Sequence, residues 1–351
     1  MADKVKFGII GTGAIAAMHA EALHNAHNAE LVAVFDQVGE RAQQFAEKYN
    51  VRAVSSFEDF LADKEIQAVT VATPTGIHNK VAVPAALAGK HLLCEKPLDV
   101  TTEKVDEIIA ACDKTGVLMM SVFQSRFVKN VELIKQAVDA GRFGKIVLVS
   151  CQCKWFRTQE YYDSASWRGT WALDGGGALM NQSIHTIDLL QYLNGDVDEV
   201  MAATATLSHT GIEVEDNAVA ILKYKNGALG TIEGSTSCQP GFPRRVEISG
   251  SLGSVVLEDN KLVRWQFVNE EPGDEEIRKS GGVGEVISGG GAGDPMAISS
   301  NGHRIQIEAL AEAILSGRKK IDLDGREGRR AVALICSIYK SAKLGAPVKV
   351  C

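Results

Sequence analysis

The chain has 351 residues, of which 45% are hydrophobic and 23% charged, and its formal net charge is −7. This length favours two domains over one small core, and the acidic balance argues against a nucleic-acid partner because phosphate binding needs a cationic surface. No apolar run reaches the ~20 residues that a membrane-spanning helix needs, and the N-terminus lacks a signal-peptide pattern.

The chain contains seven cysteines. An odd number excludes complete internal pairing, and a chain with a large core does not need disulfides, so we expect reduced thiols and a cytoplasmic protein. Cys151 and Cys153 lie two apart in an expected strand with no matching His or Cys motif nearby. We interpret them as buried core thiols and predict no metal site.

Residues 1–123 alternate strand and helix patterns. Apolar runs lie at 5–10, 31–35, 68–72 and 91–94, and helical patterns lie at 14–25, 39–49, 78–89 and 101–116. Continuous apolar strands that alternate with amphipathic helices predict a parallel sheet covered on both faces. We therefore predict an α/β, doubly wound first domain over 1–123.

The pattern changes after residue 123. Helical patterns at 131–140, after Gly175–Gly177, and at 304–315 and 326–344 accompany strand-like runs at 145–155 and between 197 and 267, with hairpin turns at 225–227 and 258–260. These patterns predict an α+β domain over 124–351 with a large open, mainly antiparallel sheet. Residues 269–301 are rich in glycine and acids, and we expect a mobile loop there.

A glycine turn follows the first apolar run. It consists of Gly11, Thr12, Gly13, Ala14, Ile15 and Ala16. This spacing between a strand and a helix is the dinucleotide-binding fingerprint, in which the glycines let pyrophosphate approach the helix N-terminus, and it predicts a Rossmann domain. Asp36, at the end of the second strand, can hold the ribose hydroxyls and would repel the extra phosphate of NADP, so NAD is preferred. Arg41 could stack on adenine and soften that preference; an ordinary strand–helix turn is the alternative interpretation.

Glu95 and Lys96 follow the apolar run at 91–94, which is expected to be a buried strand. Ligands of open parallel sheets bind beyond the carboxyl ends of the strands, so we expect this pair to face the nicotinamide, with Lys96 near a substrate hydroxyl. The alternative is an ion pair that only caps the strand.

The segments "GTGAIA", "VATPTGIHNKVAVPAALAGKHLLCEKPL" and "GGGALMNQSIHTIDLL" together resemble the Gfo/Idh/MocA family of sugar and polyol oxidoreductases. The resemblance covers essentially the whole chain. It implies a Rossmann domain, a C-terminal domain with an open sheet and a tightly held nicotinamide cofactor. It also implies that the cofactor is lined by Thr73, Pro74, His78, Glu95, Lys96, Gln124, Trp167 and Arg168.

His185 lies four residues after Asn181 and three before Asp188, near one helical face. Oxidation of a hydroxyl requires removal of its proton, which suits a histidine with a pKa near ~6.5, while an ammonium beside the oxygen stabilises the developing alkoxide. We assign His185 as general base and Lys96 as its electrostatic partner, although a core histidine is the alternative. Inositol dehydrogenase-like members carry an aspartate at the position of Asn181, and an amide can orient a substrate but cannot take its proton. Asp188 is either an orienting residue or part of the packing.

Asn181, with the preceding "YYDSASWRGTWALDGGG", resembles the UDP-N-acetylglucosaminuronate 3-dehydrogenase and glycoside 3-dehydrogenase branch. Between Ser121 and Thr170 eight Lys/Arg stand against four Asp/Glu, although the chain is acidic overall. These cations either meet carboxylate or pyrophosphate groups or lie on the surface; they include Arg126, Lys129, Lys154, Arg157 and Arg168. Tyr161 and Tyr162 either stack on a sugar or fill the domain junction. The predicted substrate-binding residues are Lys96, Arg157, Tyr161, Asn181 and His185.

We therefore predict an NAD-dependent oxidoreductase that acts on a secondary hydroxyl, at C3, of a sugar, uronate or nucleotide sugar. The alternatives are an inositol or polyol dehydrogenase, an enzyme that retains NAD and oxidises only transiently for glycoside cleavage, and a non-catalytic NAD-binding regulator. The open sheet would expose an apolar face, so we expect a homodimer or homotetramer. We expect no nucleic-acid or membrane partner.

Overall fold

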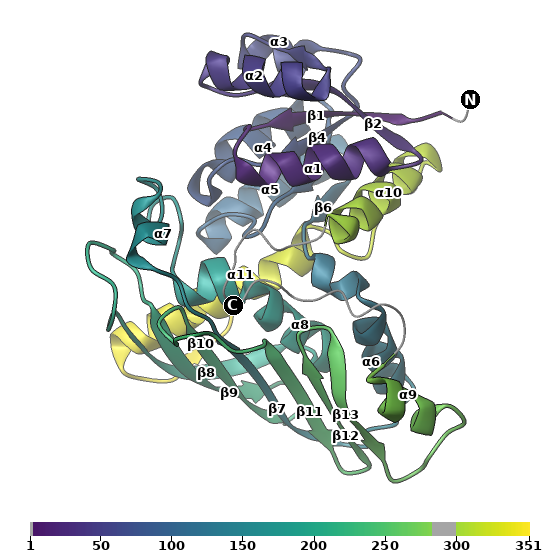
Figure 1. Ribbon diagram of the computed structural model, residues 1–351, viewed down its shortest axis with the longest axis vertical. Coiled ribbons are helices and arrows are strands. Elements are labelled where there is room, and N and C mark those ends of the chain that lie inside the picture. The colour runs from purple at the N-terminus through teal and green to yellow at the C-terminus, as the bar shows by residue number, and fades with distance from the viewer. Residues whose placement is uncertain (1–2, 283–299) are drawn as a thin grey trace. The chain divides into compact units, whose positions relative to one another are not determined.

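The computed structural model describes residues 3–282 and 300–351 (Figure 1). The chain forms two compact units: unit 1 contains Met1–Gln124 and Ser300–Arg329, and unit 2 contains Ser125–Ser299 and Arg330–Cys351. The first boundary lies where the sequence pattern changes. We expected the chain to pass once from a domain of residues 1–123 to a domain of residues 124–351. Instead, residues 300–329 return to unit 1.

Unit 1 is built on a sheet of six parallel strands in the order β3-β2-β1-β4-β5-β6. The strands are β1 (Val5–Ile10), β2 (Ala29–Phe35), β3 (Arg52–Ala53), β4 (Ala68–Val71), β5 (His91–Cys94) and β6 (Met119–Ser121). The central strands are almost continuously buried, because helices cover both faces, which confirms the predicted doubly wound architecture.

The helices of unit 1 pack against this sheet. They are α1 (Ala14–Asn25), α2 (Gly39–Tyr49), α3 (Phe57–Ala62), α4 (His78–Leu87), α5 (Thr102–Thr115) and α10 (Asn301–Leu315), with a short 3₁₀ turn η1 (Thr75–Ile77). Helix α10 packs beside α1, and its Ile307 and Leu310 join the same buried cluster as Phe7 and Ala16, so the late segment completes the core of the first unit (Figure 1).

Unit 2 is built on an eight-stranded sheet in the order β13-β12-β11-β7-β10-β9-β8-β14. Its strands are β7 (Ile146–Lys154), β8 (Val197–Ala205), β9 (Asn217–Tyr224), β10 (Leu229–Ser235), β11 (Arg245–Gly250), β12 (Gly253–Glu258), β13 (Lys261–Phe267) and β14 (Val348–Lys349). Only the β7–β10 pair is parallel, so the sheet is mainly antiparallel, as predicted.

One face of this sheet is covered, and the described residues leave the other face exposed. Helix α8 (Ile184–Asn194) packs on β7 and β11, and the remaining helices of the unit are α6 (Lys129–Asp139), α7 (Gln159–Asp163), the π-helical turn η3 (Ala178–Ser183), α9 (Asp274–Ser280) and the greater part of α11 (Gly325–Leu344). Along β9 the side chains alternate between buried and exposed, which is the pattern of a sheet with only one covered face.

The expected mobile loop at 269–301 is wrong for Asp274–Ser280, which forms α9. Asp274 is buried, receives bidentate hydrogen bonds from Arg142 and a third from the indole of Trp265, and thereby holds α9 to the sheet. Residues 283–299 of that expectation lie outside the described residues.

The thiols of Cys151 and Cys153 are buried in β7, as expected, and burial raises the pKa of Cys153 to about 11. Within the described residues, no helix is long and apolar enough to cross a bilayer.

Candidate functional site

The strand register of unit 1 gathers the predicted cofactor residues at one edge of its sheet. Ile10 pairs with Phe35 and with Val71, and Val71 pairs with Cys94, so these four strand ends lie in one row. The residues that follow them are Gly11, Asp36, Ala72 and Glu95. This edge is where open parallel sheets bind their ligands.

The glycine turn fits a bound pyrophosphate. Gly11 has φ +90°, and a Cβ there would lie 2.8 Å from the Ala72 carbonyl oxygen, so a side chain is excluded by the chain itself. Gly13 differs, because a Cβ at this position would meet no atom of the described residues within 4 Å. Gly13 is the N-cap of α1 and has no side chain that could occupy the first N–H groups of the helix. The open space and the N–H groups, including those of Ala14 and Ile15, suit a phosphate that approaches the backbone.

Asp36 is held in place beside this turn. Its Oδ2 accepts hydrogen bonds from the Thr12 backbone N–H (2.8 Å) and hydroxyl (2.9 Å), and its Oδ1 accepts one from the Val38 N–H (2.9 Å). A carboxylate has about four acceptor positions, so the half-buried Asp36 retains capacity for ribose hydroxyls. Arg41, which we predicted beside the adenine, is exposed in the first turn of α2.

Thr73 and Pro74 follow the last residue of β4 at the same edge and are half-buried. His78, the first residue of α4, is buried, and its two ring nitrogens lie 2.9 Å from the Pro97 carbonyl oxygen and 2.8 Å from that of Thr73. The ring therefore ties the segment after β4 to the segment after β5. Burial lowers the pKa of His78, while the hydrogen bonds to the Thr73 and Pro97 carbonyl oxygens act in the opposite direction.

Glu95 and Lys96 leave β5 at this edge. Glu95 is 5% exposed, whereas Lys96 is half-buried, and the Lys96 backbone N–H donates to Glu95 Oε2 at 3.0 Å. Gln124 stands three residues after β6 and begins the 3₁₀ turn η2 (Gln124–Phe127). Its Cβ lies 2.7 Å from where a Cβ on Gly302 would be, so α10 can approach it only with glycine at 302.

In unit 2, the helix that carries Asn181 and His185 begins at a carboxylate clamp. Glu215 Oε2 accepts from the Gly177 N–H (3.1 Å), Oε1 accepts from the Leu179 N–H (2.8 Å), and the Glu215 carbonyl accepts from the Ala178 N–H (3.1 Å). The Tyr339 hydroxyl also donates to Oε1, at 2.9 Å. One residue thus satisfies three successive N–H groups at the helix start.

The glycine triplet makes this clamp possible. A Cβ on Gly176 would lie 2.0 Å from the Tyr339 hydroxyl oxygen, and one on Gly177 would lie 2.0 Å from the Glu215 carbonyl oxygen. These glycines therefore serve close backbone packing. The turn η3 that follows is π-helical, a local irregularity that often occurs at functional sites.

Asn181 lies in η3 and has an acidic neighbour that the sequence did not reveal. Its amide donates to Oδ1 of the buried Asp174, and its own Oδ1 accepts from Gln182 Nε2 at 3.0 Å. Position 181 itself cannot take a proton, but a carboxylate is thus in direct contact with its side chain.

His185 is 9% exposed in the first turn of α8. Asp188, one turn later, is held by the Arg126 guanidinium, whose Nε and Nη2 donate at 2.8 and 2.6 Å, and both partners are buried. Arg126 also lies over the Tyr192 ring at 4.5 Å. The Arg126 side chain therefore makes structural contacts within unit 2. The ion pair with Arg126 favours a packing role for Asp188.

A cationic and aromatic cluster follows β7. Arg168 lies over the rings of Tyr161 (4.3 Å) and Trp167 (4.5 Å), and its Nη1 donates to the Tyr161 hydroxyl at 2.7 Å. Gln182 Nε2 donates to the same hydroxyl at 2.8 Å, and Gln182 Oε1 accepts from Arg157 Nη2 at 2.8 Å. Burial raises the pKa of Tyr161, so the phenol keeps its proton. The cluster brings together Arg157, Tyr161, Trp167 and Arg168 as one connected set.

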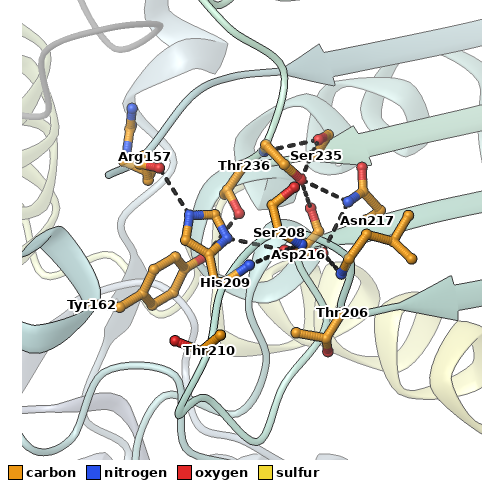
Figure 2. Close-up of polar contacts among 12 residues, drawn as sticks. Arg157, Tyr162, Thr206, Ser208, His209, Thr210, Asp216, Asn217, Ser235 and Thr236 are labelled. Carbon is orange, nitrogen blue, oxygen red and sulfur yellow. Dashed lines mark hydrogen bonds and ion pairs between the residues drawn. The ribbon is translucent and has the colours of Figure 1, made fainter. Parts of the chain in front are cut away.

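A second hydrogen-bond network contacts the backbone of Arg157 through His209 and Asp216 (Figure 2). The His209 ring lies between Asp216 Oδ2, 3.0 Å from Nδ1, and the Arg157 carbonyl oxygen, 2.8 Å from Nε2. Asp216 is buried and also accepts from the N–H groups of residues 207–209. Burial alone would raise its pKa, but these hydrogen bonds hold the pKa of Asp216 below its ordinary value. Tyr162 is buried, and its hydroxyl shares a hydrogen bond of 2.8 Å with the Thr236 hydroxyl, which favours the packing role over stacking on a sugar.

Two models of known protein families match the chain. Residues 5–123 match the model of the oxidoreductase family with an NAD-binding Rossmann fold, and residues 131–256 match the GFO/IDH/MocA C-terminal domain. The chain is 31% identical to the myo-inositol 2-dehydrogenase of Thermotoga maritima over 78% of this chain and 81% of the relative. It is 27% identical to an inositol 2-dehydrogenase of Rhizobium meliloti over 96% of each.

Among solved structures, the chain is 35% identical to the WlbA dehydrogenase of Bordetella pertussis in complex with NADH and UDP-GlcNAcA. That similarity covers 99% of each chain with a TM-score of 0.87. The protein belongs to the GFO/IDH/MocA family of oxidoreductases, and unit 1 contains the NAD-binding Rossmann domain of that family.

Proposed function

We propose that the protein oxidises a secondary hydroxyl, at C3, of a pyranose that is a uronate or nucleotide sugar, with NAD as oxidant. The observation that carries this proposal is the strand register of unit 1. It brings Glu95 and Lys96 to the same sheet edge as Gly11 and Asp36, so a lysine stands among the residues suited to the dinucleotide.

The residues present suit an alcohol dehydrogenation. NAD, when bound, supplies the nicotinamide carbon that accepts a hydride. His185 accepts the proton of the hydroxyl as the carbonyl forms, and the Lys96 ammonium stabilises the negative charge that develops on the same oxygen. Asn181 orients the substrate through its amide, with Asp174 fixing the direction of that amide.

The substrate class rests on charge and on similarity. Arg168 is half-buried and contacts Tyr161, and guanidinium groups bind carboxylate and phosphate oxygens well. Arg157 is 3% exposed, so it supports this cluster from the interior through Gln182. The WlbA relative binds UDP-GlcNAcA, which carries both kinds of anion. This combination favours an anionic sugar over a neutral one.

A neutral cyclitol is the second candidate, because the Thermotoga maritima relative is a myo-inositol 2-dehydrogenase. The residue at position 181 distinguishes the two candidate functions. Inositol dehydrogenase-like members resemble this chain but carry an aspartate where it has Asn181, and Asp174 is the acid that contacts this position here.

The test is a screen of NADH absorbance with UDP-GlcNAcA, simple uronates, neutral pyranosides and myo-inositol, with and without 2-oxoglutarate to reoxidise the cofactor. Reduction of the product with borodeuteride, followed by mass spectrometry and NMR, locates the oxidised carbon. We expect turnover of the anionic sugar and deuterium at C3.

Other outcomes would contradict the proposal in different ways. Turnover of myo-inositol alone would identify a polyol dehydrogenase, and deuterium at another carbon would refute the C3 assignment. Glycoside cleavage or epimer exchange without net NADH would identify an enzyme that retains its cofactor. Cofactor binding with no sugar turned over would support a regulator.

We also propose that the protein self-associates through the open face of the unit 2 sheet. Large apolar side chains gather on adjacent strands there: Leu148, Met201, Val219, Ile221 and Leu229, each about half exposed or more. Exposed Lys223 and Thr231 lie on the same face, beside Leu229 and Ile221. A gathering of large exposed apolar side chains often marks an interface. A homodimer or homotetramer would cover it.

A further inference from the structure

A buried cluster of one carboxylate and two imidazoles lies behind Lys96 in unit 1. His19 of α1 is 0% exposed, Glu95 is 5% exposed and His303 of α10 is 2% exposed. Glu95 Oε1 lies 2.8 Å from His19 Nε2 and 3.4 Å from His303 Nε2, and the two rings meet edge to face with centroids 4.8 Å apart. Sequence positions 19, 95 and 303 thus meet at one atom.

The other carboxylate oxygen of Glu95 contacts the backbone of Lys96, the residue to which we assign a role in the proposed reaction. Oε2 accepts the Lys96 backbone N–H at 3.0 Å. The carboxylate is therefore fixed by imidazoles on one side and itself fixes the Lys96 peptide on the other.

Burial and the hydrogen bonds between Glu95 and the imidazoles together shift the pKa values in this cluster. Burial, together with the nearby His303, lowers the pKa of His19, so its ring is neutral and donates through Nε2–H. Burial alone would raise the pKa of Glu95, but the hydrogen bonds from His19 and His303 hold it well below its ordinary value. Glu95 is therefore an anion that accepts hydrogen bonds from both imidazoles.

A metal ion is the competing interpretation, because the three side chains offer ligand atoms within 4.8 Å of one another. The outer ring nitrogens argue against it. Nδ1 of both His19 and His303 is buried and has no hydrogen-bond partner among the described residues. Metal-bound histidines normally donate this second N–H to an acceptor. In the neutral Nε2–H form Nδ1 carries no proton, so no buried N–H is left unpaired.

We propose that His19 and His303 are positioning residues for Lys96, which hold Glu95 as an oriented anion so that Glu95 fixes the Lys96 peptide. This inference rests on the proposed function for the role of Lys96. It also gives a reason for the return of α10 to unit 1, because α10 supplies the second imidazole.

The test compares His19→Leu, which removes the donor, with His19→Gln, whose amide N–H can take the place of Nε2–H. The direct readout is the Lys96 amide resonance in protein labelled with ¹⁵N-lysine, assigned by its loss in Lys96→Met and followed from mildly acidic to mildly alkaline pH. We expect no titration of this resonance in the wild type or in His19→Gln. We expect a clear titration in His19→Leu, because a carboxyl group that has lost its main donor takes up a proton.

Activity gives the second readout. In His19→Leu we expect kcat to fall by about 10- to 100-fold and to gain a new acidic limb, because small displacements of a reacting group cost this much. We expect His19→Gln to restore most of the loss, with NAD affinity nearly constant throughout. If His19→Leu does not fold, His303→Leu and His303→Gln provide the same comparison.

Several results would overturn the inference. A Lys96 amide that behaves alike in the Leu and Gln variants, with an unchanged pH profile, would leave the imidazoles without this role. One equivalent of zinc in the purified wild type, lost in His19→Leu, would show a metal site. If Lys96→Met keeps full turnover, the proposed function of Lys96 fails; if Lys96→Met is inactive while His19→Leu is unaffected, only the positioning role fails.

Discussion

Asp36 is the residue at which the choice between NAD and NADP is expected to be made. Its carboxylate is held by the Thr12 N–H and hydroxyl and by the Val38 N–H, so its charge has a fixed position beside the glycine turn. A fixed negative charge repels the additional phosphate of NADP, and the repulsion is strongest where water is excluded.

We predict that Asp36→Asn, which removes the charge and keeps the shape, raises the ratio of kcat/KM for NADP to that for NAD by about tenfold or more. The measurement is initial rates with both cofactors at constant ionic strength. Glu40→Gln removes an exposed acid from the first turn of α2 and is the control. An unchanged ratio in Asp36→Asn, or an equal change in the control, would remove this role from Asp36.

For single residues, the sequence predicts the position of those candidate site residues that lie at the end of a strand. Gly11 and Asp36 directly follow an apolar run and Lys96 lies two residues beyond one, so the rule for open parallel sheets is sufficient to place them at the sheet edge. The contacts of His19, Asp174, Glu215 and His303 could not be predicted, because the partner of each is distant in sequence or outside the motif. The only local signal is an acid or a histidine inside an apolar segment, which is equally typical of a core residue.

Among the elements, the segment η3–α8 depends on contacts from elsewhere in the chain. Apolar spacing predicts a helix after Gly175–Gly177, and the helix exists, but its first turn is π-helical. This irregularity could not be predicted, since the clamp that defines it comes from Glu215 and Tyr339. The spacing of Asn181 and His185 on an ideal helix therefore does not describe their arrangement.

Glu215 should make the stability of the protein depend on pH. Burial raises the pKa of Glu215 from 4.5 to about 7, despite its hydrogen bonds. Between these two values the native protein keeps a proton that the unfolded chain has released, so raising the pH lowers the free energy of unfolding. The contribution of this group is thus fully present below the unfolded value and is lost as the pH rises through about 7.

We predict that Glu215→Gln removes this component. The wild type should exceed the variant in free energy of unfolding by the largest margin at mildly acidic pH, and the margin should shrink by up to about 1.4 kcal/mol per pH unit toward neutrality. Urea denaturation across this range measures it. Glu213→Gln, at an exposed position two residues earlier, is the matched control. A margin that stays constant or grows with pH would contradict the assignment.

For the whole molecule, the two-domain organisation and both sheets could be predicted from composition and periodicity, whereas the path of the chain could not. The helical pattern near 304–315 is visible in the sequence, but nothing local shows that it packs on α1 in unit 1. That placement depends on the complementarity of two apolar faces separated by almost the whole chain.

The open sheet of unit 2 leads to a prediction about assembly. Ile221 is 62% exposed on β9 and pairs in register with the exposed Met201 of β8. Ile221→Lys should shift the protein from an oligomer to a monomer in sedimentation velocity, because an unpaired charge is costly to bury in an apolar interface. Leu344→Lys changes a residue that is equally exposed, at 61%, but lies at the end of α11, and it should leave assembly unchanged. A wild type that is monomeric, or an oligomer unaffected by Ile221→Lys, would refute the proposed interface.

The most direct test of the central claim is a double-mutant cycle on Lys96 and His185, followed by NADH formation from UDP-GlcNAcA or the best substrate of the screen. We predict that Lys96→Met and His185→Ala each lower kcat/KM by about 10²- to 10⁴-fold with NAD affinity nearly unchanged, and that the double variant is little worse than the poorer single variant. Residues that serve one hydroxyl act as a unit, so their losses do not multiply. A double variant whose loss equals the product of the two single losses, or a single variant with full turnover, would contradict the account.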